Sequence, residues 1–280
     1  MPYIKTDDGV NLYYESAGEG TPIVFVHEYA GDHRSWEPQM RHFSRNFRCI
    51  AYSARGYTPS DVPTSADDYS QHRVSEDIRC VLDGLNISRA HVVGLSMGAF
   101  ATLHFGMRFA TDRANSRALS LTLAGVGTGS HPDAYEGFQK ESVALADRIM
   151  AEGMAEVAKT YSLGPTRLAF QRKDPRGFEE FARMMGEHST PGSSLTARGY
   201  QGRRPSLYKL TEQIARVAVP TLILCGDEDE PCLEPSLMLK RTIPGAALGI
   251  FPASGHGINL EEPALFNQML SDFLLAVTVR

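Results

Sequence analysis

Short apolar runs alternate along the chain with longer stretches in which apolar residues recur every three or four positions. The apolar runs occupy residues 23–26, 48–52, 91–95, 119–124, 221–225 and 247–251. Strands that are apolar on both faces are typical of a parallel sheet covered by helices on both sides. Before them, residues 3–6 and 10–16 flank the turn signal Asp8-Gly9, which predicts an antiparallel pair of strands.

The stretches between these runs have the spacing of amphipathic helices. Residues 36–43 follow Ser35, a candidate N-cap, and residues 74–85 carry apolar side chains three and four positions apart. Residues 264–277 repeat this spacing and predict a terminal helix that packs on the sheet. Because strands and helices alternate, we predict an α/β fold with a mostly parallel central sheet, flanking helices and right-handed crossovers.

One long segment interrupts this alternation. Residues 128–209 contain no strand-like run, whereas residues 142–150, 155–161 and 178–185 have helical spacing. Pairs that combine Pro with Gly or Asp separate these helices. We therefore predict one core, formed by residues 1–127 and 210–280, that is interrupted by a helical insertion of residues 128–209.

Composition narrows the class of protein. A chain of 280 residues with 42% hydrophobic residues can bury a large core without disulfides or metal. The net charge of -5 disfavours binding to nucleic acid, and no apolar run is long enough to cross a membrane. The first residues lack the pattern of a signal peptide, so we expect a cytoplasmic protein with reduced cysteines. The cysteines form no C-x-x-C pair, and we expect neither a metal nor a cofactor.

The sharpest chemical signal is Gly94-Leu95-Ser96-Met97-Gly98. The predicted strand 91–95 precedes Ser96, and residues 99–109 continue with helical spacing. A serine in a sharp turn between a strand and a helix is typical of a nucleophile elbow, which lifts the hydroxyl above the edge of the sheet. We therefore predict that Ser96 is a nucleophile.

A nucleophilic serine needs a base, and the base needs an orienting carboxylate. His256 follows the last predicted strand, at the sheet edge where open α/β sheets bind ligands. The strand 221–225 is followed by four acids in a row, residues 227–230. We favour Asp229, which follows Gly226 by three residues and is therefore expected at the apex of this loop, as the partner of His256, and Asp227 remains the alternative. The order serine, acid, histidine is that of the α/β-hydrolases.

Taken together, these motifs resemble the cap-bearing α/β-hydrolases of the hydrolase and haloperoxidase-like group. The resemblance extends over nearly the whole chain. It rests on the elbow, on His27, on Ala54-Arg55-Gly56-Tyr57 with Ser60, on Gly226-Asp227-Glu228-Asp229, and on Gly255-His256 before Glu261-Glu262-Pro263. It implies a Ser96–His256–Asp229 triad, with an oxyanion hole formed by the backbone N–H groups of Met97 and Tyr29. It also implies that residues 128–209 are a cap over Ser96.

The sequence departs from this family at Glu28, where relatives usually carry glycine after the histidine. Glycine suits unusual backbone angles that glutamate tolerates poorly. Glu28 therefore either adopts an ordinary conformation or stores strain. We expect His27 and Glu28 to serve in substrate binding or in anchoring a neighbouring loop.

The cap region carries a net charge of +2, and its second half is rich in basic residues. These are Arg167, Arg172, Lys173, Arg176, Arg183, Arg198, Arg203 and Arg204. A solvated surface is the favoured explanation, and a clamp for a substrate carboxylate is the alternative.

The motifs predict a serine hydrolase for a small-molecule ester, lactone or amide. Two alternatives stay open: hydrolysis of a carbon–carbon bond beside a ketone, and a non-catalytic small-molecule receptor on the same fold. The oligomeric state, including a homo-oligomer, stays open as well.

Overall fold

Eight strands form the centre of the computed structural model, which describes residues 2–278. Residue 1 and residues 279–280, the last two of the predicted core, lie outside the described part. The strands are β1 Tyr3–Lys5, β2 Asn11–Ala17, β3 Pro22–Val26, β4 Arg48–Tyr52, β5 Ala90–Leu95, β6 Ala118–Ala124, β7 Thr221–Gly226 and β8 Ala247–Phe251. Each begins and ends within one residue of the predicted strand.

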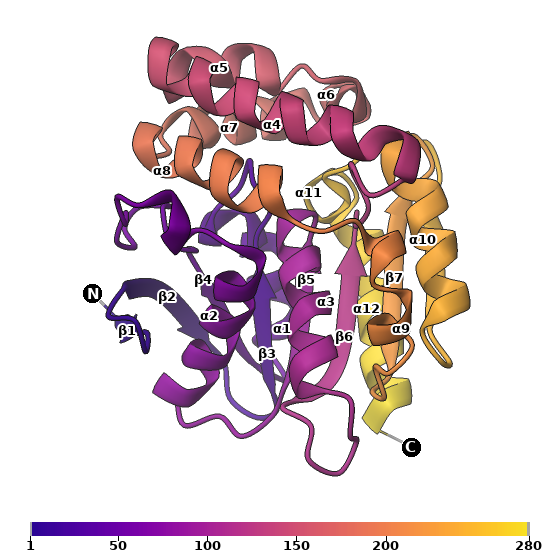
Figure 1. Cartoon of the computed structure of the whole chain (residues 1–280). Coiled ribbons are helices and arrows are strands. Elements are labelled where there is room, and N and C mark those ends of the chain that lie inside the picture. Colours follow the sequence, from indigo (N-terminus) through magenta and orange to yellow (C-terminus); the bar gives the residue numbers. More distant parts are fainter. Residues whose placement is uncertain (1, 279–280) are drawn as a thin grey trace.

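These strands form one sheet in the order β1-β2-β4-β3-β5-β6-β7-β8 (Figure 1). The pairs β1–β2 and β2–β4 are antiparallel, and every later pair is parallel. After β3 the chain adds β4 on one side of that strand and then β5 on the other side. The order in which strands are added therefore reverses between β3 and β5. Loops at the carboxyl ends of such strands meet above this point, where ligands bind in open α/β sheets.

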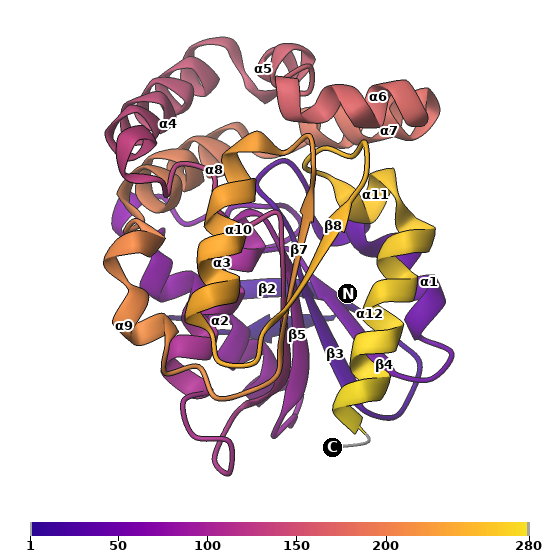
Figure 2. The ribbon, with the colours of Figure 1, turned by 90° about the vertical axis from the view of Figure 1, so that its right-hand side faces the viewer.

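Helices cover both faces of the sheet. Those of the core are α1 Glu37–Phe43, α2 Gln71–Gly84, α3 Met97–Phe109, α10 Glu230–Thr242, α11 Ile258–Glu261 and α12 Pro263–Thr278. Figure 2 shows α1 and α12 on one side of the sheet and α2, α3 and α10 on the other. Along β3, Ile23 and Phe25 are buried against the first pair, whereas Val24 and Val26 belong to the core on the other side. Burial on both faces explains why the strands are continuously apolar.

The segment between β6 and β7 is helical. It contains α4 Pro132–Glu152, α5 Met154–Tyr161, α6 Leu168–Lys173, α7 Pro175–Gly186 and α8 Thr190–Leu195, and α9 Thr211–Ile214 follows. Helices α4 to α8 form a layer above the carboxyl ends of the parallel strands (Figure 1). This layer therefore lies directly over the loops that follow β3, β5, β7 and β8.

One capping prediction is wrong. The helix predicted from residue 36 begins as a 3₁₀ turn, His33–Trp36, and continues as α1. Ser35 lies inside that turn and donates its hydroxyl hydrogen to the Asp32 carbonyl oxygen, 2.7 Å away. The cap is Asp32, whose carboxylate accepts from the backbone N–H of Arg34. A short polar side chain one turn earlier satisfies the free N–H groups, which the apolar spacing alone could not show.

Between residues 2 and 278, no helix combines the length and the apolar character that crossing a membrane requires. The four cysteines are buried free thiols.

Candidate active site

Ser96 occupies a strained turn between β5 and α3. Its backbone angles are φ 52° and ψ −114°, in a region that residues with a side chain rarely adopt. The turn is tight, because a Cβ atom on Gly98 would lie 2.1 Å from the Val26 carbonyl oxygen. A Cβ atom on Gly94 would lie 2.3 Å from the carbonyl oxygen of Gly98. Both flanking glycines are therefore required by close backbone approach, and the strain holds the Ser96 side chain at the end of the strand.

His256 and Asp229 meet at the same edge of the sheet. His256 lies in the loop after β8, and Asp229 follows β7 directly before α10. The Nδ1 atom of His256 is 2.7 Å from Oδ2 of Asp229. Burial by itself would raise the pKa of the Asp229 carboxyl, but the His256 imidazole and the hydrogen bond to it hold that pKa below its usual value. Asp229 is thus a buried carboxylate that faces an imidazole.

The neighbouring acid, Asp227, has a different role. Its side chain is exposed, and its Oδ1 atom accepts a hydrogen bond from the backbone N–H of Ser254 at 3.0 Å. The N–H groups of Ser254 and Ala253 lower the pKa of the Asp227 carboxyl. Asp227 therefore joins the loop after β7 to the loop after β8, and the acid in contact with His256 is Asp229.

Cys232 completes this cluster, and sequence reasoning missed it. Its sulfur lies 3.9 Å from Nδ1 of His256 and 3.4 Å from the Gly125 carbonyl oxygen. The ligand atoms of Asp229, Cys232 and His256 lie within 4.8 Å of one another, which is close enough for a metal ion. Burial raises the pKa of the Cys232 thiol well above its usual value, and the His256 nitrogen nearest the sulfur is the one that bonds Asp229. The sequence could have indicated that Cys232 lies near Asp229, because it follows Asp229 by three residues at the start of a helix.

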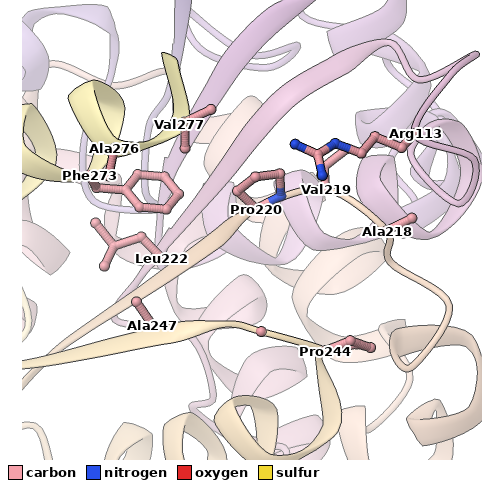
Figure 3. A pocket seen from close by; sticks show the side chains of 11 residues that line it. Arg113, Ala218, Val219, Pro220, Leu222, Pro244, Ala247, Phe273, Ala276 and Val277 are labelled. Atoms are coloured by element: carbon pink, nitrogen blue, oxygen red, sulfur yellow. The ribbon is translucent and has the colours of Figure 1, made fainter. Parts of the chain in front are cut away.

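Ser96 and His256 line one cavity of about 290 Å³. The core contributes Tyr29 and Pro231 as well, and the layer above the sheet contributes Phe138, Tyr161, Arg167 and Arg204. A separate pocket of about 390 Å³ lies at the amino ends of β7 and β8, where Leu222, Ala247 and Phe273 line it (Figure 3). Its lining contains no serine, histidine or acid. The cavity that brings reactive groups together is therefore the one beneath the helical layer.

A family model for the α/β-hydrolase fold matches residues 21–263. The chain belongs to the α/β-hydrolase family. The predicted fold class and the resemblance to α/β-hydrolases are confirmed by this match.

Relatives of the hydrolase match it over almost its full length. An AB hydrolase superfamily protein of Bacillus subtilis is 30% identical over 275 residues, which are 97% of this chain and 98% of the relative. The 3-oxoadipate enol-lactonase 1 of Acinetobacter baylyi is 27% identical over 258 residues, 91% of this chain and 89% of the relative. The crystal structure of the enol-lactonase from Burkholderia xenovorans LB400 has a TM-score of 0.83 at 22% identity and covers 98% of this chain and 100% of its own, a likeness of fold. The prediction of an α/β-hydrolase enzyme is confirmed.

In this hydrolase, His27 connects two loops. Its Nε2 atom accepts from the backbone N–H of Ala54 at 2.9 Å, and its Nδ1 atom is 2.7 Å from the carbonyl oxygen of Glu28. Burial lowers the pKa of His27 to about 4, so the ring is neutral at pH 7. The neutral ring must then carry its proton on Nδ1 and donate it to Glu28. His27 therefore positions the loop after β3.

The hydrolase should lose stability as the pH falls from 7 to 5. Burial lowers the pKa of both His27 and His91 from 6.5 to about 4. Between pH 7 and 5 the unfolded chain therefore binds protons that the native chain does not, and each histidine should lower the free energy of unfolding by about 2 kcal/mol. Urea unfolding at both pH values measures this change. His91→Leu should remove its share of the pH dependence, and an unchanged dependence would contradict the argument.

Glu28, the departure from the family pattern, pairs with Arg167. Its backbone has no positive φ, so the residue stores no left-handed strain. Both carboxylate oxygens accept from the Arg167 guanidinium, with Nη1 2.8 Å from Oε1 and a second bond from Nη2 to Oε2. Burial by itself would raise the pKa of Glu28, but the Arg167 charge and its hydrogen bonds hold that pKa below its usual value. Both residues are buried. Glu28 therefore ties the loop after β3 to the 3₁₀ turn Pro165–Arg167 of the helical layer.

Replacing one member of this buried pair should lower the free energy of unfolding strongly. Arg167→Met leaves the Glu28 carboxylate buried without its partner and should lower the free energy of unfolding by about 3–5 kcal/mol. The matched control is Arg172→Met, because Arg172 joins α6 to the core through an exposed pair with Glu228 at 2.8 Å. That control should cost less than about 1 kcal/mol.

Urea unfolding of the single variants and of Arg167→Met combined with Glu28→Gln checks the interpretation. The double variant should regain most of the lost stability, because neither charge is then buried alone. Equal losses for Arg167→Met and Arg172→Met would show that the buried pair has no special role.

Two backbone N–H groups beside Ser96 are predicted to face the reacting oxygen. Met97 is the first residue of α3, so its N–H has no partner within the helix. Tyr29 lines the cavity, and its backbone N–H forms no hydrogen bond with another backbone group of residues 2–278. The Tyr29 hydroxyl donates to the Ser193 carbonyl oxygen at 3.0 Å, which fixes the loop against the helical layer.

Proposed function

We propose that the protein is a serine hydrolase that cleaves a small-molecule ester, lactone or amide through an acyl-enzyme. One observation carries the proposal: the buried Asp229 carboxylate bonds Nδ1 of His256 at 2.7 Å, and His256 shares a cavity with the strained Ser96. This bond leaves Nε2 of His256 for the serine hydroxyl, which is the arrangement that a serine nucleophile needs.

The reaction follows from these positions. The Ser96 oxygen forms a bond to the substrate carbonyl carbon while His256 takes the hydroxyl proton. Asp229 holds the imidazole orientation and stabilises the imidazolium that forms. The bond to the leaving group then breaks, and His256 returns the proton to that group. Water, deprotonated by His256, attacks the acyl-enzyme and releases the acid and free Ser96.

Negative charge develops on the carbonyl oxygen during both attacks. In our proposal the N–H groups of Met97 and Tyr29 stabilise it, and the Met97 donor benefits from the positive end of α3. A donor of this kind typically contributes about 3 kcal/mol to transition-state stabilisation. The Arg167 guanidinium neutralises the Glu28 charge next to this loop, so the carboxylate does not oppose the developing oxyanion.

Residues 128–209 act in this proposal as a cap that closes the site from above. Phe138 and Tyr161 of this segment line the cavity with Ser96. Exclusion of water by such a cap strengthens every electrostatic interaction within the site. The name of the Acinetobacter relative is that of an enol-lactonase, and this favours the ester and lactone class over amides.

A fluorophosphonate probe tests the proposal. Native protein should be labelled, heat-unfolded protein should not, and mass spectrometry of the digested adduct should place the label on Ser96. A native protein that stays unlabelled beside a labelled control serine hydrolase would favour the receptor interpretation. A panel of esters, lactones, amides and diketones then separates acyl hydrolysis from cleavage of a carbon–carbon bond.

A further inference from the structure

Arg204 is a buried cation that faces the cavity of Ser96 and His256. Only 4% of its surface is exposed, and it lies at the end of the cap, after α8. A second guanidinium in the same cavity, that of Arg167, is paired with Glu28. Among residues 2–278, no carboxylate lies within salt-bridge distance of Arg204. This absence distinguishes Arg204 from its neighbour.

The contacts of Arg204 are all with neutral groups. Nη2 donates to the Thr128 carbonyl oxygen at 2.5 Å, and Nη1 donates to the side-chain oxygen of Gln201. The guanidinium carbon lies 3.8 Å from the ring centroid of Phe100 and 4.6 Å from that of Phe138. A guanidinium has five N–H donors, and within residues 2–278 that of Arg204 forms only these two hydrogen bonds to protein acceptors.

The charge of Arg204 survives its burial. Burial lowers the pKa of Arg204 to about 10, so the side chain remains a cation at pH 7. The largest electrostatic contributions at Arg204 come from three tyrosines and Cys232. Burial raises the pKa of Cys232, Tyr161 and Tyr200, and these groups stay neutral. A buried charge is costly unless an opposite charge meets it, and the aromatic rings replace only part of its hydration.

We propose that Arg204 binds a carboxylate of the substrate, so that the substrate is an ester or lactone with a separate anionic group. This inference rests on the proposed function, because it assigns the substrate class of the same cavity. The planar fork of a guanidinium matches a carboxylate with two parallel hydrogen bonds. The bound substrate would provide the counter-charge that the protein itself does not supply.

The position of Arg204 also limits the length of the substrate. Its guanidinium stacks on Phe100, which follows Ser96 by four residues in α3. Ser96 and Arg204 also line the same cavity, whose volume is about 290 Å³. A carboxylate at Arg204 and a carbonyl carbon at Ser96 therefore belong to one small molecule, such as the half-ester of a dicarboxylic acid with a few carbons.

The test compares two substrates that differ in one charge. These are 4-nitrophenyl hydrogen glutarate and its methyl ester, whose hydrolysis releases the same chromophore. In the native protein kcat/KM should be at least tenfold higher for the anion. Arg204→Gln should lower the ratio of the two kcat/KM values by about 10- to 100-fold, since a hydrogen bond to a charged group is lost. Arg204→Lys should lie between the two, because it keeps the charge and loses the fork.

Arg203→Gln is the matched control. Arg203 is the adjacent residue, but it is exposed and pairs with Asp67 at 3.0 Å. This variant should leave the ratio unchanged. An equal ratio for the two substrates in the native protein, or equal shifts in the ratio for Arg203→Gln and Arg204→Gln, would overturn the inference. If Arg204→Gln does not fold, the native ratio decides.

Binding separates this inference from the proposed function. Calorimetry should show glutarate binding to the native protein and to Ser96→Ala, and no binding to Arg204→Gln. That result without ester turnover would contradict the proposed serine-hydrolase function and support the anion site. Turnover of both esters at equal rates, without glutarate binding, would support the proposed serine-hydrolase function and contradict the anion site. Stronger binding of inorganic phosphate than of glutarate would overturn the assignment to a carboxylate.

Discussion

Ser96→Ala should lower kcat by about 10⁴- to 10⁶-fold, because the variant has no atom that can form the acyl-enzyme. The activity that remains should come from substrate binding and the oxyanion N–H groups alone. Alanine carries a Cβ atom as serine does, so the strain of the positive φ at this position is the same in the variant. We therefore expect a melting temperature close to that of the native protein, so that the loss reflects chemistry and not unfolding.

Initial rates with a 4-nitrophenyl ester measure this loss. The matched control is Ser271→Ala, which removes a half-buried hydroxyl that bonds the Asn267 carbonyl oxygen at 2.7 Å in α12, outside the lining of the cavity. The control should keep kcat within about twofold, as surface substitutions usually have small effects. A Ser96→Ala variant that retains one hundredth of the native kcat would exclude Ser96 as the nucleophile.

Asp229→Asn should lower kcat by about 10⁴-fold while the fold stays intact. The amide can donate a hydrogen bond to Nδ1 of His256, which favours the tautomer with its proton on Nε2. That tautomer cannot accept the proton of Ser96, and no negative charge remains to stabilise the imidazolium. The pH profile should change along with kcat.

Asp227→Asn is the control for this result, because Asp227 stands two residues away and bonds the Ser254 N–H instead of His256. Its kcat should fall by less than about threefold, and its main effect should be on stability. The comparison uses the same ester for both variants. A larger loss of kcat at Asp227 than at Asp229 would reverse the assignment.

The strands could be predicted from the sequence because each is buried on both faces. β4 and β8 begin and end at the predicted residues, and the others differ by one residue at one or both ends. The start of α1 could not be predicted in the same way. Capping depends on which polar side chain reaches a free N–H, and Asp32 and Ser35 are equally suitable by residue type.

The acid that contacts His256 could be distinguished from its neighbours only in the structure. Four acids follow β7, and residue type does not separate them, whereas burial does: Asp229 is buried, and Asp227 is exposed. The partner of Glu28 could not be predicted either, because Arg167 follows it by 139 residues. No local spacing indicates a contact between segments so far apart in sequence.

The basic residues of the cap show the same limit. A solvated surface was the favoured explanation, and it is right for Arg172 and Arg176, which are exposed. It is wrong for Arg167 and Arg204, which are both 4% exposed. Periodicity shows which face of a helix is polar, but both of these residues lie outside regular α-helix, where no periodicity applies.

The turn at residues 165–167 also joins the helical layer to the loop that carries His256. The Thr166 carbonyl oxygen accepts from the backbone N–H of His256 at 2.8 Å, and Lys173 pairs with Glu262 at 2.6 Å near the same loop. The Glu28–Arg167 pair, the Tyr29–Ser193 hydrogen bond and the Arg172–Glu228 pair also join residues 128–209 to the core. A segment joined to the core at so many places should not swing as one rigid body about a single hinge. We therefore expect the substrate to enter by local bending of segments away from this turn, while the loop that carries His256 stays in place.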